Sequence, residues 1–191
     1  MIVAKLGGSV AAGSGLRRWL DALESGRGRL VLVPGGGAFA ETVREQQRRH
    51  GFGEAAAHRM ALLAMEQYAV MLADAARWLV PCADGAEIGA ALRRGAAAVW
   101  LPSAMALADP AIPQSWAVTS ESLAAWLARR LGASLLVLIK SVAAPQPLDA
   151  AALAGSGLVD PAFPEFLAGA GVGLAWAGPG DETALARRLA A

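Results

Sequence analysis

Cysteine, histidine and lysine are all scarce in this chain of 191 residues. The single cysteine, Cys82, excludes an internal disulfide framework and a cysteine metal cluster. Apolar residues are abundant, but no run of them approaches the roughly 20 residues that a membrane span needs, and the amino terminus lacks a signal-peptide pattern. A formal net charge of +1 argues against a general nucleic-acid binder. These absences predict a cytoplasmic globular protein with neither a nucleic-acid nor a membrane partner.

The scarcity of lysine is informative because arginine is not scarce: fifteen arginines accompany only Lys5 and Lys140. A compact ammonium group can approach a single phosphate oxygen, whereas the planar guanidinium favours bidentate partners. Each lysine ends or follows an apolar run, Ile2–Leu6 or Leu135–Ile139. Ligands of open α/β sheets bind at the carboxyl ends of strands. This placement favours a shared polyanion site over chance retention of the two lysines.

Three consecutive glycines, Gly35–Gly37, separate the apolar run Leu30–Val33 from a helical pattern that begins at Phe39. A buried strand, a glycine loop and a helix amino terminus together bring backbone N–H groups close to phosphate oxygens. A tight strand-to-helix turn without a ligand is the alternative interpretation. A second glycine loop that could hold phosphate beside Lys5 consists of Gly7, Gly8 and Ser9.

Apolar periodicity predicts strands that alternate with helices, and hence one α/β domain over residues 1–191 around a mainly parallel sheet. The predicted strands are Ile2–Leu6, Leu30–Val33, Val80–Ala83, Ala97–Leu101, Leu135–Ile139 and Val172–Ala177. The predicted helices with defined bounds are Leu16–Ser25, Phe39–His50, Ala55–Leu79, Gly85–Arg94, Asp149–Leu153 and Asp160–Leu167, the last ended by a break at Gly169–Gly173. Another helix is predicted to run to Leu131 with Thr119 or Ser120 as its cap. A terminal helix is predicted after Asp181.

Three further features have two interpretations each. The proline-containing stretch Ala108–Ser115 is long enough to be a lid or an inserted loop over a site. His58, in the first turn of the predicted helix Ala55–Leu79, is a candidate substrate contact, with a capping or solvated histidine as the alternative. The methionine and aromatic stripe of the same helix is typical of core packing or of a subunit interface.

Three segments occur together in the order and spacing of one known family: K-L-G-G-S at Lys5, V-P-G-G-G-A-F-A at Val33 and A-V-T-S-E-S-L-A at Ala117. On these segments the chain resembles the amino acid kinase family, which includes acetylglutamate, aspartate, carbamate and uridylate kinases. The resemblance implies a three-layer αβα sandwich of the carbamate kinase-like type. Further segments, L-P-S at Leu101 and V-D-P-A-F-P at Val159, look most like the (aminomethyl)furanmethyl phosphate kinase branch of methanofuran and methylofuran biosynthesis.

The resemblance implies transfer of the γ-phosphoryl group of ATP to a small phosphate monoester, with Mg²⁺ bridging the ATP phosphates and no evident protein ligand for the metal. An acceptor phosphate is already anionic, so this chemistry needs no general base. The implied catalytic residues are Lys5, Glu121 and Lys140. The implied ATP- or phosphate-binding residues are Lys5, Gly7, Gly8, Ser9, Lys140 and Ser141. The implied acceptor-binding residues are Gly35, Gly36, Gly37, Phe39, His58, Thr119 and Ser120.

The chain departs from the family on the nucleotide side. Relatives follow the Lys140 strand with a segment of the form D-V-D-G-I-Y, where this chain has S-V-A-A-P-Q-P, and Glu121 stands where the family has aspartate. The implied acceptor half, about residues 1–115, looks intact, whereas the nucleotide half, about 116–191, is short. The alternatives are therefore a non-catalytic binding or scaffold relative and a kinase for another small acidic acceptor, an amino acid or a nucleotide.

Family members usually pair through helices, which implies a homodimer or a higher homo-oligomer.

Overall fold

The computed structural model describes residues 1–11, 15–168 and 170–191, so Gly169, in the predicted break Gly169–Gly173, lies outside it. The described strands are β1 (Ile2–Leu6), β2 (Leu30–Pro34), β3 (Leu79–Cys82), β4 (Ala97–Trp100), β5 (Leu135–Ile139) and β6 (Gly173–Ala177). The described helices are α1 (Gly8–Ala11), α2 (Leu16–Glu24), α3 (Gly37–His50), α4 (Glu54–Ala75), α5 (Gly85–Arg93), α6 (Ser103–Ala108), α7 (Ser120–Leu131), α8 (Ala150–Gly155), α9 (Phe163–Leu167) and α10 (Glu182–Ala190).

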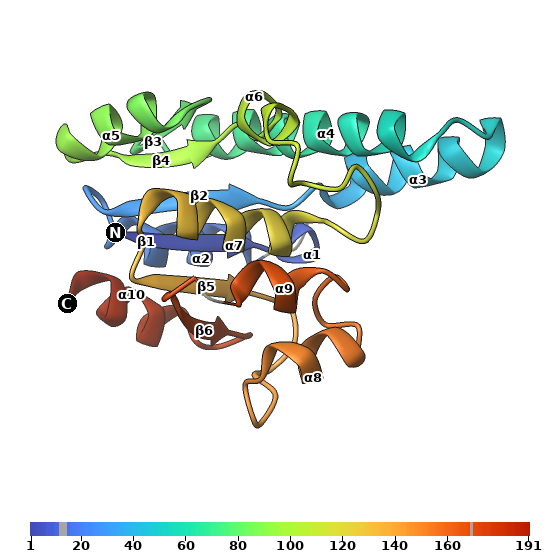
Figure 1. The fold of residues 1–191 in the computed structure, drawn as a ribbon. Helices are drawn as coiled ribbons and strands as arrows, with labels where there is room; N and C mark the ends of the chain where they lie inside the picture. The colour runs from blue at the N-terminus through green and yellow to red at the C-terminus, as the bar shows by residue number, and fades with distance from the viewer. Residues whose placement is uncertain (12–14, 169) are drawn as a thin grey trace.

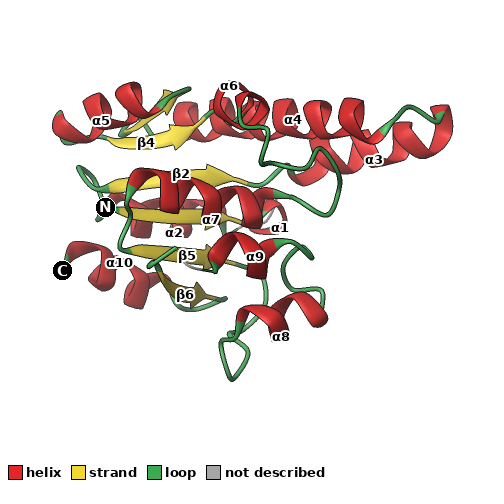
Figure 2. Cartoon of the chain, viewed as in Figure 1, coloured by secondary structure: helices red, strands yellow, loops and turns green. Residues whose placement is uncertain are grey.

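The six strands form one sheet in the order β3-β4-β2-β1-β5-β6, and every neighbouring pair is parallel. Helices cover both faces of this sheet (Figures 1 and 2). The core on the α7 side includes Val3, Leu123 and Leu136, and the core on the α2 and α10 side includes Leu6 and Leu23. The predicted three-layer αβα sandwich with a parallel central sheet is therefore confirmed.

Two helices extend the molecule beyond the carboxyl ends of the strands. α3 and the amino-terminal half of α4 pack against each other and project past the sheet edge (Figure 1). Leu62 and Met65 of α4 reach the core on the α7 side, whereas Tyr68 and Leu72 pack in the core on the other side. The projecting pair forms one wall at the edge of the sheet where ligands of open α/β folds bind.

The clearest differences from the sequence predictions concern the end of α4 and two helices, α1 and α6. α4 ends at Ala75 rather than at Leu79, because Leu79 pairs with Ala97 in the sheet and Ala76 is already extended. A helix, α1, begins at Gly8, directly where the sequence predicts a glycine loop. α6 was not predicted, and it forms where Ala106 packs into the core on the α7 side. In all three cases tertiary packing outweighs the local pattern.

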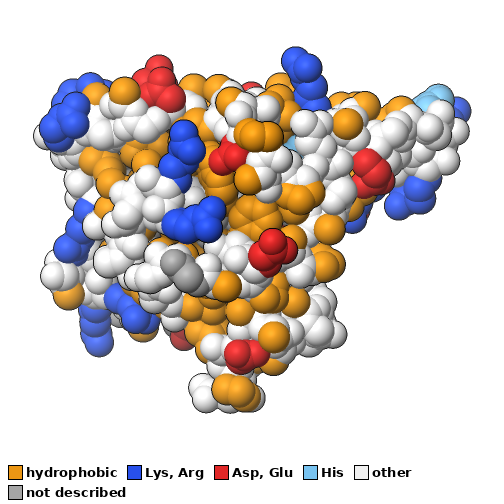
Figure 3. Space-filling view, in the orientation of Figure 1, with side chains coloured by type: hydrophobic (Ala, Val, Ile, Leu, Met, Phe, Trp, Pro, Cys, Tyr) orange, Lys and Arg blue, Asp and Glu red, His pale blue; other side chains and the backbone are white. Residues whose placement is uncertain are grey.

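Charged side chains do not gather into one patch on the face that Figure 3 shows. No helix among the described residues is long and apolar enough to cross a membrane.

Candidate active site

A cavity of about 530 Å³ opens at the carboxyl edge of the sheet, where α3 and α4 meet the ends of β1, β2 and β5. Nearly all of the site residues implied by the resemblance line it, although they come from five separate segments of the chain. These are Lys5, Gly7, Gly8, Ser9, Gly35, Gly36, Gly37, His58, Thr119, Ser120, Glu121, Lys140 and Ser141. Phe39 does not line the cavity: its ring packs edge-on against Tyr68 with the ring centroids 5.1 Å apart.

Strand register brings the two lysines together. β1 and β5 are neighbours, with Lys5 opposite Leu138 and Leu6 opposite Ile139, so Lys140 lies just beyond the end of β1. Side chains alternate between the faces of a strand, and Val3 and Leu138 both belong to the core on the α7 side. Lys5 and Lys140 continue these two rows and therefore point toward the same face, where α7 begins.

Glu121, in the first turn of α7, lies between the two ammonium groups. Its Oε1 accepts hydrogen bonds from Lys5 Nζ at 2.7 Å and from Lys140 Nζ at 2.5 Å. Lys5 is only 3% exposed and Glu121 only 6% exposed. Each ammonium group carries three N–H donors, so this contact leaves others on both lysines to meet further oxygens.

Burial and charge act in opposite directions on these groups. Burial by itself would raise the pKa of Glu121, but the nearby charges and hydrogen bonds of Lys5 and Lys140 hold that pKa well below its ordinary value. Burial lowers the pKa of Lys5, and the Glu121 carboxylate opposes that effect while Lys140 adds to it. Glu121 therefore stays ionised near neutral pH and is a poor proton acceptor. Two ammonium groups contact the one Glu121 carboxylate, and the Asp160 carboxylate also acts on Lys5. Ammonium groups that line a cavity suit an incoming polyanion.

The two glycine turns touch each other through their backbones. A Cβ atom on Gly8 would lie 2.5 Å from the Cα of Gly37, and one on Gly37 would lie 2.4 Å from the Tyr68 ring. The N–H groups of Gly7 and Gly35 already donate to the carbonyls of Ile139 and Leu6, so they fix the turns and are not available for phosphate. The first N–H groups of α3 have no partner within their helix and remain the donors suited to an anion. Close packing thus explains part of the glycine pattern that the sequence attributes to ligand binding.

Gly8→Ala should lower the free energy of unfolding by about 2–3 kcal/mol, because the added methyl group meets backbone that cannot rotate away. Gly155→Ala is the matched control, since a Cβ atom there would meet nothing within 4 Å among the described residues outside its own helix backbone and chain neighbours. Urea denaturation of both variants measures the difference. Equal stability of Gly8→Ala and the wild type would mean that the two turns do not pack as described.

The cavity wall far from the sheet is formed by α3, α4 and the end of the loop that follows α6. Trp116 lines it and donates from Nε1 to Gln47 at 2.6 Å, while the Arg44 guanidinium lies 4.0 Å from the centre of the Trp116 ring.

His58 is buried rather than solvated, and its Nε2 has no partner within the described residues. Burial lowers the pKa of His58, against a hydrogen bond with the Ser115 backbone, so the ring is neutral. No residue of the predicted loop Ala108–Ser115 lines the cavity, whereas Trp116, directly after it, does.

The cavity takes fewer residues from the chain after β5. Lys140, Ser141, Val142, Gly157 and Leu158 line it, and the Ser141 hydroxyl lies 3.0 Å from that of Ser9. The Val142 carbonyl accepts from Trp176 Nε1 at 3.0 Å and would lie 2.7 Å from a Cβ atom on Gly178. The segment after β5 therefore lies directly against the end of β6. Among the described residues there is no cluster of three or more His, Cys, Asp and Glu side chains that could hold a metal ion.

Asp160 is the main residue near the site that sequence reasoning missed. It is 7% exposed, and its Oδ2 accepts from the backbone N–H groups of Thr119 and Ser122, each at 3.1 Å. Asp160 thus caps α7, a role that the sequence analysis gives to Thr119 or Ser120, whereas Thr119 makes no side-chain cap. The sequence signal, Asp160 before Pro161, predicts only the start of the next helix.

The sequence and the fold both resemble those of known proteins. The sequence pattern of the amino acid kinase family matches residues 1–144. Over 144 residues the chain is 24% identical to "[5-(aminomethyl)furan-3-yl]methyl phosphate kinase" of Methanocaldococcus jannaschii, a match that covers 74% of this chain and 66% of that relative. The chain thus spans slightly less than two thirds of that relative's length.

Solved structures show the same fold. Uridylate kinase from Archaeoglobus fulgidus has a TM-score of 0.72 at 16% identity, with 98% of this chain and 94% of that chain covered. UMP kinase from Bacillus anthracis has a TM-score of 0.67 at 13% identity, with 98% and 91% covered. At such identities the likeness concerns the fold and not the substrate. Because the family pattern spans more than half of the sequence, the chain belongs to the amino acid kinase family.

Proposed function

We propose that this protein is a kinase that transfers the γ-phosphoryl group of ATP to a small phosphate monoester and forms a diphosphate. The observation that carries the proposal is the pair of ammonium groups held on one carboxylate oxygen, 2.7 Å and 2.5 Å away, beside two glycine turns. Phosphoryl transfer depends mainly on positioning and on neutralising the charge of the transferring group. This site supplies positive charge and backbone donors, and an acceptor phosphate that is already anionic needs no general base.

In the proposed reaction an oxygen of the acceptor phosphate attacks the γ-phosphorus, and the bond from that phosphorus to the bridging oxygen of ADP breaks. Lys5 contacts oxygens of the transferring group, and Lys140 contacts the donor phosphates near Ser9 and Ser141. Glu121 holds both lysines in place. The amino terminus of α3, at Gly36 and Gly37, holds the acceptor phosphate. The acceptor-binding half is thus about residues 1–115 and the nucleotide-binding half about 116–191, within one domain.

Mg²⁺ carried on the ATP phosphates would supply further charge neutralisation when bound. The described residues fit a metal held by the nucleotide rather than by the protein, because they offer no multidentate acidic cluster.

The acceptor we favour is (aminomethyl)furanmethyl phosphate, in biosynthesis of a one-carbon carrier. Support comes from the relative in Methanocaldococcus jannaschii and from the cavity wall opposite the lysines. There, His58 offers a neutral ring, and the Glu41 carboxylate lies 3.6 Å from the guanidinium of Arg44, which lines the same wall and offsets its charge. The other acceptor class is a small acidic metabolite such as an amino acid or a nucleotide.

A second candidate function is a non-catalytic relative that binds the phosphate ester without productive ATP binding. The contact of Val142 with Trp176 and Gly178 favours it, because this contact leaves little room between the ends of β5 and β6.

Thermal shift and product analysis separate the two candidates. A ligand that binds the native state raises its stability by RT ln(1 + [L]/Kd). A kinase should be stabilised by Mg-ATP and, with the furan phosphate, should release ADP and a diphosphate visible by ³¹P NMR. Stabilisation by the furan phosphate alone, without any effect of Mg-ATP, would support the binding protein. Turnover of UMP but not of the furan phosphate would mean that the acceptor is a nucleotide.

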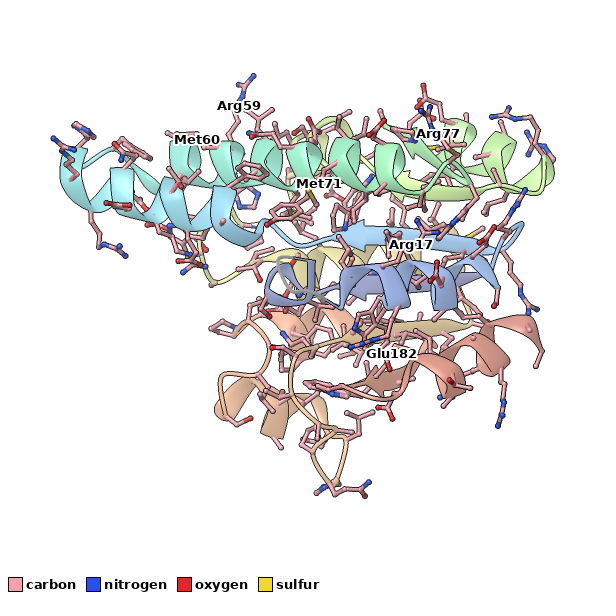
Figure 4. All side chains as sticks on the ribbon, turned by 180° about the vertical axis from the view of Figure 1, so that it is seen from behind. Arg17, Arg59, Met60, Met71, Arg77 and Glu182 are labelled. Carbon is pink, nitrogen blue, oxygen red and sulfur yellow. The ribbon has the colours of Figure 1, made fainter. Side chains whose placement is uncertain are left out.

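We also propose that the chain forms a homodimer or a higher homo-oligomer through α4. Met60, Leu63, Val70 and Met71 are all exposed, Val70 by 62%, and their spacing places them along one side of the helix. Figure 4 shows Met60 and Met71 on α4. Exposed apolar side chains that form a row, rather than standing singly, mark interaction surfaces.

Leu63→Glu combined with Val70→Glu should convert the oligomer to a monomer, because two charges would enter the proposed interface. Arg17→Glu on α2 is the control and should leave the mass unchanged. Light scattering after size exclusion measures the mass of each protein. A monomeric wild-type chain would contradict the proposed interface.

A further inference from the structure

Asp160 lies close to the lysine cluster, yet it does not line the cavity. Its two oxygens together take hydrogen bonds from the backbone N–H groups of Thr119 and Ser122 and from the Ser122 hydroxyl. These contacts tie the segment between α8 and α9 to the first turn of α7. They orient the turn that carries Glu121.

One more contact continues from Asp160 to the lysines. Thr119 Oγ1 lies 2.9 Å from Asp160 Oδ2 and 2.8 Å from Glu121 Oε2. A hydroxyl has one proton and can donate to only one of these carboxylates at a time. Asp160 also holds Thr119 through its backbone N–H, so the hydroxyl proton is available for Glu121 Oε2. The other hydroxyl near Glu121 Oε2, that of Ser120, is 3.5 Å away and contributes little. The Thr119 hydroxyl is therefore the main contact on Oε2, and it leaves Oε1 directed at both lysines.

A glutamate side chain has several rotatable bonds, so one contact does not hold its carboxylate in a single orientation. Sharing Oε1 between two ammonium groups requires the other oxygen to be held as well. We infer that Asp160 is a positioning residue that acts through Thr119 to fix Glu121 against Lys5 and Lys140. Thr119 is accordingly a link within the protein rather than a contact to the acceptor. The kinetic consequence rests on the proposed kinase function, but the linkage itself does not.

A set of four variants tests the linkage. Thr119→Val keeps the shape but removes the hydroxyl, and Thr119→Ser restores it. Asp160→Asn removes the carboxylate charge. Ser122→Ala is the matched control, because it loses a contact with Asp160 that does not lead to Glu121. It therefore separates helix capping from the positioning of Glu121.

The assay uses Mg-ATP and (aminomethyl)furanmethyl phosphate. Thr119→Val and Asp160→Asn should each lower kcat by about ten-fold or more, while KM changes little. The reason is that displaced lysine ammonium groups stabilise the transition state less well but still allow the substrates to bind. Thr119→Ser and Ser122→Ala should keep kcat within about three-fold of the wild type, even if Ser122→Ala lowers the melting temperature. The double variant Thr119→Val/Asp160→Asn should be no slower than the slower single variant, because both changes break one linkage. An unchanged kcat in Thr119→Val, or equal losses in Thr119→Val and Ser122→Ala, would overturn the inference.

A second measurement does not need turnover. Because the chain has only two lysines, ¹⁵N labelling of lysine should give two side-chain Nζ signals by NMR. Both should move in Thr119→Val and return in Thr119→Ser, with Ser122→Ala resembling the wild type. If no phosphate ester is turned over but these shifts occur, the kinase proposal fails and the positioning role stands. If the signals do not move in Thr119→Val, the positioning role fails whatever the activity.

Discussion

Lys5→Met should lower kcat by roughly 10²–10³-fold while the protein remains folded. Lys5 is buried at the end of β1, and it is proposed to place an ammonium group on the transferring phosphoryl group. Removing one preorganised donor from a site that stabilises transition-state charge has effects of this size. Methionine fills a similar volume, and Lys140 still contacts the Glu121 carboxylate. The buried negative charge therefore keeps a partner, and the loss of stability should be smaller than for removal of Glu121 itself.

Steady-state kinetics with Mg-ATP and the furan phosphate check this result, and circular dichroism checks the fold. Arg17→Met is the control, because it removes a positive charge from an exposed position on α2, where Arg17 pairs with Asp21. It should leave kcat unchanged. A Lys5→Met enzyme with near-normal kcat would exclude the proposed role of Lys5.

Glu121→Gln should destabilise the protein by about 3–5 kcal/mol at pH 7, the usual result of removing one partner from a buried ion pair. The change keeps the size of the side chain but leaves Lys5 and Lys140 facing each other without the carboxylate that both contact. The activity should fall as well, because the two ammonium groups repel each other away from their shared position. Urea denaturation at pH 7 measures the loss, with Asp21→Asn on the surface as a control that should change stability by less than about 0.5 kcal/mol.

The pH dependence gives this prediction a second test. The pKa of Glu121 is lowered on folding, so its ionised form contributes stability that is fully present above the unfolded-state pKa, near about 4.3. That contribution is lost as the pH falls from there toward the folded-state pKa. The stability gap between the wild type and Glu121→Gln should therefore be constant near neutral pH and should narrow below about pH 4. A gap that does not change with pH would mean that the glutamine acts through packing rather than through charge.

Much of the secondary structure follows from local pattern. The strands Ile2–Leu6 and Leu135–Ile139 have the predicted bounds, because short apolar runs that end at glycine or at a polar residue have few alternatives. The predictions were wrong where packing outweighs propensity, as at the end of α4 and in α1. His58 shows the same limit: its place in the first turn of a helix does not reveal that α4 projects past the sheet and buries the ring against the Ser115 loop.

The sequence by itself determined the alternation of strands and helices, the two strand ends that carry lysine and the glycines that follow β1 and β2. Only the tertiary structure decided that β5 is the neighbour of β1, that α7 begins between their lysines, and that Asp160 caps α7. The physical reason is separation along the chain. Residue 121 lies 116 positions from residue 5, and contacts of that range depend on strand order and on the packing of whole layers, which no local pattern encodes.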